Sequence, residues 1–73
     1  MNNEGEKRVL PGEIVVAESL RRIVSVNGHE QRVTGVKSIN NTGSWTRLDT
    51  DQGYVIVNND NVLCFIIRDG KQF

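Results

Sequence analysis

The sequence is poor in the residues that usually reinforce very small proteins. Its 73 residues include one cysteine, Cys64, and one histidine, His29, so neither a disulfide within the chain nor a zinc site can supplement the core. A domain of this size buries only about 60% of the surface that its unfolded chain exposes. We therefore expect marginal stability, with self-association into a homo-oligomer as the remaining reinforcement.

Long apolar runs are also missing. Apolar runs such as residues 62–67 are far shorter than the roughly 20 residues that a helix needs to span a bilayer. The opening stretch MNNEGEKRVLPG contains acidic side chains and lacks the apolar segment of a secretory signal. We expect a cytoplasmic protein with no membrane partner, a location that suits one unpaired cysteine.

The formal net charge is zero, so no field of the whole molecule draws the protein toward nucleic acid or a membrane. The charges are nevertheless unevenly distributed. Residues 19–48 contain five basic side chains and a single acidic one, Glu30, whereas the segments on both sides are net acidic. This basic segment includes the stretch SVNGHEQRVTGVKS, residues 25–38, and is the first candidate for a binding surface.

The distribution of apolar residues predicts an all-β fold. Residues 1–8 are polar and are predicted to form a disordered tail, and residues 9–73 a single domain. From Glu13 onward, short runs of Val, Ile, Thr and aromatic residues alternate with Gly, Asn and Asp, and no segment of ten residues has helical periodicity. We expect a small barrel of five or six strands, SH3-like or Sm-like, built from two hairpins plus a closing strand.

The dipeptide Asn27-Gly28 predicts the first hairpin, because both residues tolerate the positive φ angles of a two-residue type I′ loop. This loop pairs Val26 with His29 and fixes which side chains share a face. The inward face is then predicted to hold Leu20, Val24, Val26 and Val33, and the outward face Arg21, Arg32 and Thr34. A bulge at Gly35 would turn Val36 inward and Lys37 outward.

A second hairpin is predicted around the four-residue loop TDQG, with Asp49 opposite Tyr54 and Leu48 opposite Val55. Two assignments of its faces remain open. Either the inward residues are Leu48, Val55 and Val57, which leaves Trp45, Arg47 and Tyr54 on the opposite face, or Trp45, Tyr54 and Ile56 are buried instead.

The stretch NNDN, residues 58–61, predicts a capped helical turn, because its side chains bond readily to backbone amides. The following stretch VLCFIIR predicts a last strand that is apolar on both faces. Such a strand is expected to be central or closing, with Cys64 in the core.

No pattern in the chain predicts an enzyme. His29 lies at a hairpin tip without a nucleophile to pair with it, and a buried Cys64 would be inert. The glycines match no phosphate-binding motif, and Asp49, Asp51 and Asp60 fit turns better than a calcium loop. We expect no catalytic residues, no metal site and no cofactor.

Two binding functions remain. The first is a regulatory protein that binds nucleic acid, preferably single-stranded, because small barrels hold single strands with a positive groove and exposed rings. The contact residues would be Arg21, Arg32, Lys37, Trp45, Arg47 and Tyr54. The alternative is a protein-protein interaction module, an adaptor, inhibitor or assembly subunit, that uses an open edge or exposed apolar residues such as Ile23. In that case Trp45 is a core residue and the arginines are ordinary solvated charges.

Overall fold

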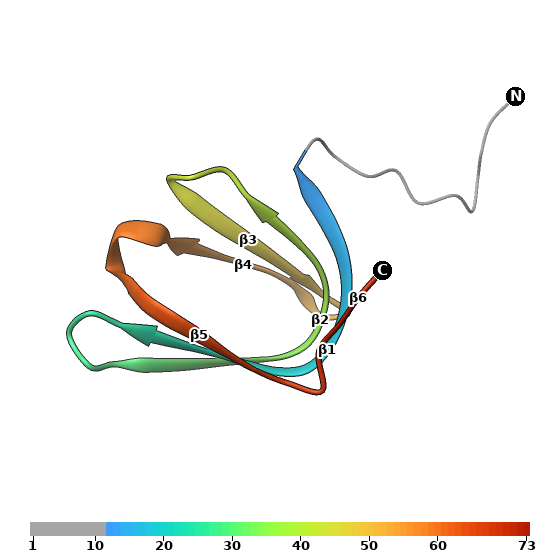
Figure 1. Cartoon of the computed structure of the whole chain (residues 1–73), viewed down its shortest axis with the longest axis horizontal. Helices are drawn as coiled ribbons and strands as arrows, with labels where there is room; N and C mark the ends of the chain where they lie inside the picture. The colour runs from blue at the N-terminus through green and yellow to red at the C-terminus, as the bar shows by residue number, and fades with distance from the viewer. Residues whose placement is uncertain (1–11) are drawn as a thin grey trace, which may run out of the picture.

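The computed structural model describes residues 12–73, which form one strongly bent antiparallel sheet (Figure 1). The predicted tail, residues 1–8, lies outside the described residues. The strands are β1 (Glu13–Ser25), β2 (Glu30–Asn41), β3 (Trp45–Thr50), β4 (Gly53–Asn58), β5 (Val62–Arg68) and β6 (Lys71–Gln72), with a short 3-10 helix η1 (Asn59–Asn61) before β5. Within residues 12–73, no helix is long and apolar enough to cross a membrane.

The strand order is β4-β3-β2-β1-β5, and β6 pairs with the first half of β1. The prediction of an all-β fold is confirmed. The two edge strands, β4 and β5, do not pair with each other in the described part of the chain, so the sheet does not close. The prediction of a central or closing last strand was wrong, because β5 has a hydrogen-bonded neighbour, β1, on one side only.

The sheet curls because β1 and β2 are long and bend sharply near their middle (Figure 1). Gly35 lies at the bend with a φ of +65°, which costs little in the absence of a Cβ atom. The register shifts beside Lys37, and Val36 is buried while Lys37 is exposed, as predicted. One half of the β1–β2 ribbon thus pairs with β5 and the other half with β3, around a common core.

The core lies on the concave face of the sheet and contains Val16, Ile23, Val33, Val36, Leu48 and Val57. The second hairpin has the predicted register, with Asp49 opposite Tyr54 and Leu48 opposite Val55. Because Leu48 and Val57 point inward, the first of the two face assignments is the one that occurs. Tyr54 and Ile56 are accordingly exposed on the convex face.

The register predicted for the first hairpin was wrong by one residue. The loop contains three residues, Val26–Gly28, because the Gly28 N–H donates to the Ser25 carbonyl and the Ser25 N–H donates to the His29 carbonyl. Only Gly28 has a positive φ, +89°, whereas a type I′ turn also needs one at Asn27. This is the three-residue loop that ends in a left-handed glycine, and it places Val24 opposite Glu30.

A shift of one residue moves a whole arm to the other face of the sheet. Ile23 is therefore a core residue, 2% exposed, while Val26 is 61% exposed at the hairpin tip. Leu20 and Val24, also predicted to be core residues, are only half-buried. Among the four predicted core residues of this hairpin, Val33 alone is fully buried. It lies on β2, the strand whose side chains keep the predicted orientation.

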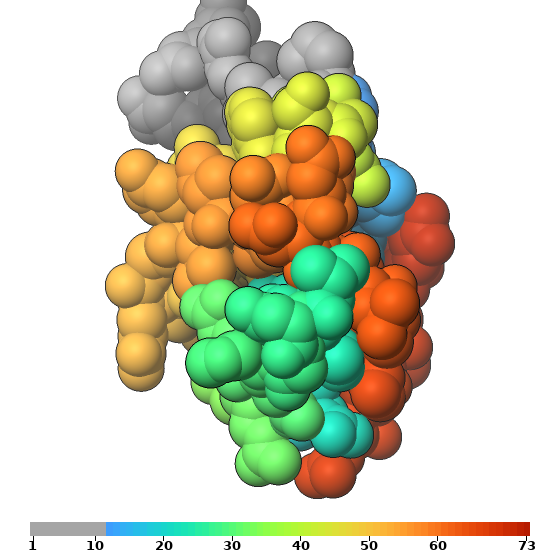
Figure 2. Space-filling model, turned by 90° about the vertical axis from the view of Figure 1, so that its left-hand side faces the viewer, coloured from blue at the N-terminus to red at the C-terminus, as the bar shows by residue number. Residues whose placement is uncertain are grey.

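The predicted helical turn is confirmed as η1. The Asn58 side chain accepts a hydrogen bond from the Asp60 N–H and caps it. The buried Thr46 hydroxyl donates to the Asn59 side chain at 2.6 Å, so η1 also satisfies a polar group of the core. The Val26 N–H donates to the Asn61 carbonyl, which holds the tip of the first hairpin against the start of β5 (Figure 2).

Candidate interaction surfaces

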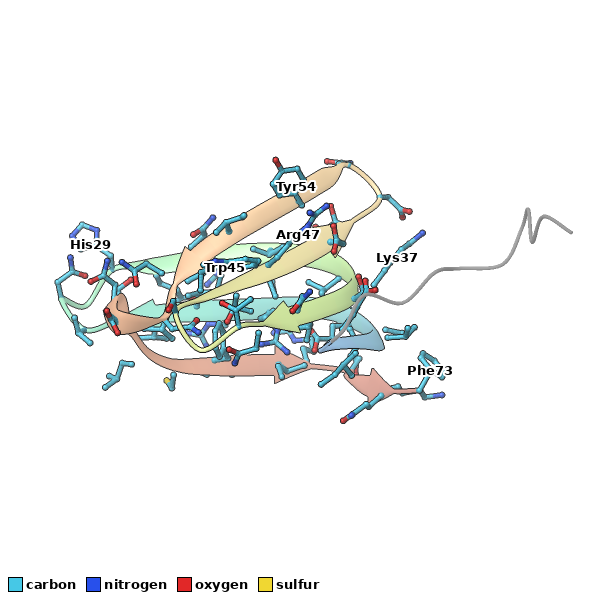
Figure 3. All side chains as sticks on the ribbon, turned by 90° about the horizontal axis from the view of Figure 1, so that it is seen from above. His29, Lys37, Trp45, Arg47, Tyr54 and Phe73 are labelled. Atoms are coloured by element: carbon cyan, nitrogen blue, oxygen red, sulfur yellow. The ribbon has the colours of Figure 1, made fainter. Side chains whose placement is uncertain are left out.

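The six residues predicted to contact nucleic acid do not form one surface. Arg21 points to the concave side, whereas Arg32 lies near the tip of the first hairpin and Lys37 near the bend of β2. Trp45, Arg47 and Tyr54 share the convex face of β3 and β4, where Arg47 contacts the Tyr54 ring (Figure 3). The structure thus gathers half of the predicted set and separates the basic hairpin from it.

Arg21 was predicted to be solvent-exposed, and this was wrong. Its side chain is 8% exposed and forms a bidentate ion pair with Glu18, whose side chain is 3% exposed. The Nε–Oε1 and Nη2–Oε2 distances are 2.8 and 2.7 Å. Strict alternation would send residues 18 and 21 to opposite faces, but the bend of β1 turns both inward. The Phe65 ring lies 4.8 Å from the guanidinium carbon and covers it.

A hollow of about 530 Å³ opens on the concave side next to this ion pair. Its walls include Ile14, Ile39 and Ile67 in addition to Glu18 and Arg21. Every buried polar side-chain atom in the described residues has a hydrogen-bond partner, so the ion pair offers no unsatisfied group to a ligand. The hollow is best suited to an apolar side chain.

The basic residues Arg22 and Arg32 near the tip of the first hairpin share one carboxylate, Glu30. Arg22 donates to both Glu30 oxygens at 2.6 and 2.9 Å, and Arg32 donates to one of them at 3.1 Å. The hydrogen bonds from Arg22 and Arg32 lower the pKa of Glu30 from 4.5 to about 2, and the Glu30 carboxylate raises the pKa of Arg22. The three side chains act as one ion-pair network on the convex face.

This network makes the stability depend on pH. Because the pKa of Glu30 is about 2 in the folded chain and near 4.5 when unfolded, its contribution is complete above pH 4.5 and is lost as the pH falls toward 2. Urea unfolding between pH 2 and 6 should show a smaller loss of stability in this range for Glu30→Gln than for the wild type. Equal slopes for the two proteins would contradict the assignment.

The convex face of β3 and β4 combines aromatic and charged groups. Trp45 and Tyr54 are exposed, and the guanidinium carbon of Arg47 lies 4.2 Å from the Tyr54 ring centre. Arg47 also forms an ion pair with Asp49 at 3.0 Å, and Lys37 forms one with Asp51. Within residues 12–73, Arg68 and Lys71 are the basic residues without an ion-pair partner, and both lie near the C-terminus.

The edge strand β5 carries the largest group of exposed apolar residues. Leu63 is 68% exposed, and Ile66 and Ile67 are 43% and 45% exposed. Cys64, predicted to lie in the core, is also exposed, so that prediction was wrong. Ile66 lies opposite Arg22 on the convex face, whereas Ile67 lines the concave hollow. Apolar surface therefore flanks an open backbone edge on both sides.

Sequence reasoning missed β5 as a candidate functional surface. The available signal is the apolar pattern on both faces, which predicts a strand that is completely buried. A strand that is covered by another protein molecule has the same pattern as one covered by its own chain.

The remaining chemical candidates are isolated. His29 is exposed immediately after the loop of the first hairpin, and its backbone N–H donates to the Asn27 side chain. In the part of the chain that the structure describes, no three His, Cys, Asp or Glu side chains are placed to hold a metal ion. Comparisons with protein-family models, curated proteins and solved structures find no match to this chain.

Proposed function

We propose that this protein is a non-catalytic interaction module that binds a protein partner along the edge of β5. The observation that carries the proposal is that β5 is an edge strand with exposed apolar side chains on both faces. Natural proteins usually protect such an edge with charged residues, proline or a covering element. Between Val62 and Ile67, β5 has no charged residue and no proline, and its one irregularity is the register shift with β1 at Leu63. An extended strand of a partner could pair with its backbone and cover Leu63, Ile66 and Ile67.

The finer fold assignment, an SH3-like or Sm-like barrel, is part of this proposal. It is supported by the strand order and by a 3-10 turn immediately before the last long strand. In a barrel of this kind that remains open between β4 and β5, an added strand can complete the sheet.

Nucleic-acid binding is a second candidate, supported by the exposed rings of Trp45 and Tyr54 beside Arg47. Stacked bases contribute about 1–3 kcal/mol each when aromatic platforms are available. The ion pairs of Arg47 with Asp49 and of Lys37 with Asp51 weaken the attraction for phosphate, and Arg21 faces the core. We therefore rank this function second.

Selection from two libraries separates the candidates. From displayed random peptides of roughly nine residues, the wild type should enrich sequences with alternating apolar residues, because these form a strand along β5. Ile66→Lys should lose this enrichment, because a charge on the edge opposes pairing. The matched control Ile56→Lys, on the other edge strand, should keep it. Enrichment would be measured by sequencing the captured pool.

The same immobilised proteins are then offered single-stranded oligonucleotides at low and moderate ionic strength. Under the proposal, oligonucleotides are not retained and Trp45 fluorescence does not change. Retention that falls steeply with salt and disappears in Arg47→Glu would favour the second candidate. A peptide pool that Ile66→Lys captures as well as the wild type would refute the β5 surface.

A further inference from the structure

The residues around Cys64, from Asp60 in η1 to Arg68 at the end of β5, form a nearly symmetric pattern, which is broken only by Asn61 and Ile67. Leu63 and Phe65 are its apolar neighbours, Val62 and Ile66 lie two residues away, and Asp60 and Arg68 lie four residues away with opposite charges. A two-fold axis through an antiparallel strand pair places each residue opposite the one equally distant from the centre. A strand with this pattern is complementary to itself.

We propose that β5 pairs with β5 of a second copy, antiparallel and centred on Cys64. The inference rests on the proposed function and names its partner. In this arrangement Leu63 lies opposite Phe65 of the second copy, and Val62 opposite Ile66. Leu63 and Ile66 of both copies are then covered by apolar residues, Ile67 lies opposite Asn61, and the open edge of each sheet gains a hydrogen-bonded neighbour.

The charges support this centre. Within residues 12–73, the side chains of Asp60 and Arg68 have no ion-pair partner, a feature that they share with Asp69 and Lys71, whereas the basic residues of β1 to β3 all have one. Asp60 lies in η1, two residues before β5 begins, so centring the pair on Cys64 brings η1 of each copy next to Arg68 of the other. Two identical ion pairs then close the ends of the interface, and opposite charges at these positions fix the register.

The other edge strand lacks these features. β4, residues Gly53–Asn58, carries no charged side chain that could fix the register of a partner.

β5 has an irregularity, since its register with β1 shifts between Val24 and Ser25 and leaves Leu63 without an opposite residue on β1. The same bulge in both copies preserves the two-fold symmetry. A two-fold pair uses both β5 edges, so the assembly closes at two copies.

The size of the contact sets the expected affinity. One strand pair buries less surface than the roughly 1,600 Å² of a standard stable interface, so we expect dissociation in the micromolar range. Sedimentation equilibrium of the full chain should show a monomer at about 1 µM and a dimer above about 100 µM. Ile66→Lys should remain monomeric throughout, whereas Ile56→Lys should dimerise like the wild type.

Cys64 provides a direct probe of the centre. Opposite Cα atoms in an antiparallel pair are about 4.5–5.5 Å apart, which lies within the span of a disulfide. Oxidation of the dimer with diamide should give a covalent dimer on a non-reducing gel, and dilution to the monomer range should prevent it. The matched control carries Cys64→Ser and Gln52→Cys, which moves the only cysteine to the exposed β3–β4 turn. It should cross-link only slowly at the same concentration.

Charge reversal tests the register. Arg68→Glu and Asp60→Lys should each weaken dimerisation at least about tenfold, because each places two pairs of like charges at the ends of the interface. The double variant Asp60→Lys/Arg68→Glu should restore dimerisation to within about threefold of the wild type, since opposite charges face each other again. Circular dichroism would verify that all three variants are folded.

The outcomes separate this inference from the proposed function. A wild type that is monomeric above 100 µM but whose peptide capture is lost in Ile66→Lys would overturn the dimer and leave the proposed function intact. A dimer that persists in Ile66→Lys, or a cysteine at position 52 that cross-links as fast as Cys64, would place the contact elsewhere and overturn the inference. A wild type that captures no peptides but forms a dimer that depends on the charges at positions 60 and 68 would support the inference and restrict the module to its own copy.

Discussion

Replacing Glu18 with leucine should lower the free energy of unfolding by about 3–5 kcal/mol. The substitution leaves the Arg21 guanidinium buried without its counter-charge, and breaking a buried ion pair from one side costs about this much. A small domain has about 5 kcal/mol of stability or somewhat more, so the variant should be close to unfolding. Urea denaturation, followed by far-ultraviolet circular dichroism, would measure the change.

Two controls isolate the pair. Glu18→Leu combined with Arg21→Met replaces both charges by apolar groups of similar volume, and it should regain most of the lost stability because no unpaired charge remains. Arg32→Met removes an arginine that is 67% exposed, and it should change stability by less than about 0.5 kcal/mol. A Glu18→Leu variant within about 1 kcal/mol of the wild type would show that the pair is not buried as described.

Replacing Ile23 with alanine should cost about 2–5 kcal/mol, because the side chain is 2% exposed and its removal leaves a cavity in the core. Val26→Ala, three residues away at the hairpin tip, should change stability by less than about 0.5 kcal/mol. Thermal and urea unfolding of the two variants would measure the difference. A two-residue loop would reverse the ranking, so a Val26→Ala that is the more destabilising variant would contradict the register.

The second hairpin could be predicted from sequence because its loop is bounded by clear signals. The stretch TDQG separates two runs of alternating residues, and the resulting pairs, Asp49 with Tyr54 and Leu48 with Val55, are those observed. The choice between its two faces needed the fold, because burial of Trp45 depended on whether another layer would cover the convex side. No such layer occurs in residues 12–73.

The first hairpin could not be resolved because Asn-Gly is compatible with two loops. A type I′ turn uses both residues in the left-handed region, whereas the observed loop needs only Gly28 there. The choice depends on packing far from the loop, where the longer form buries Ile23. An error of one residue in the loop moved Arg21 from the core to the predicted binding face and created a basic surface that the fold does not contain.

The ion pair of Glu18 with Arg21 also could not be predicted from the local sequence pattern. Their spacing along a flat strand separates them, and only the bend of β1 places both on the concave side. The sequence marks this bend with a single residue on the opposite strand, Gly35. Similarly, the apolar residues of β5 predicted burial, whereas Leu63, Cys64 and Ile66 are exposed in the described part of the chain.

The three-residue loop Val26–Gly28 limits how the gene for this protein can vary in length. Removing or adding one codon there would turn the side chains of one arm to the other side of the sheet and expose what the core requires. Adding two codons would preserve the orientation of both arms. Variation at this hairpin tip should therefore tolerate many substitutions and even-numbered insertions, but few changes by a single residue.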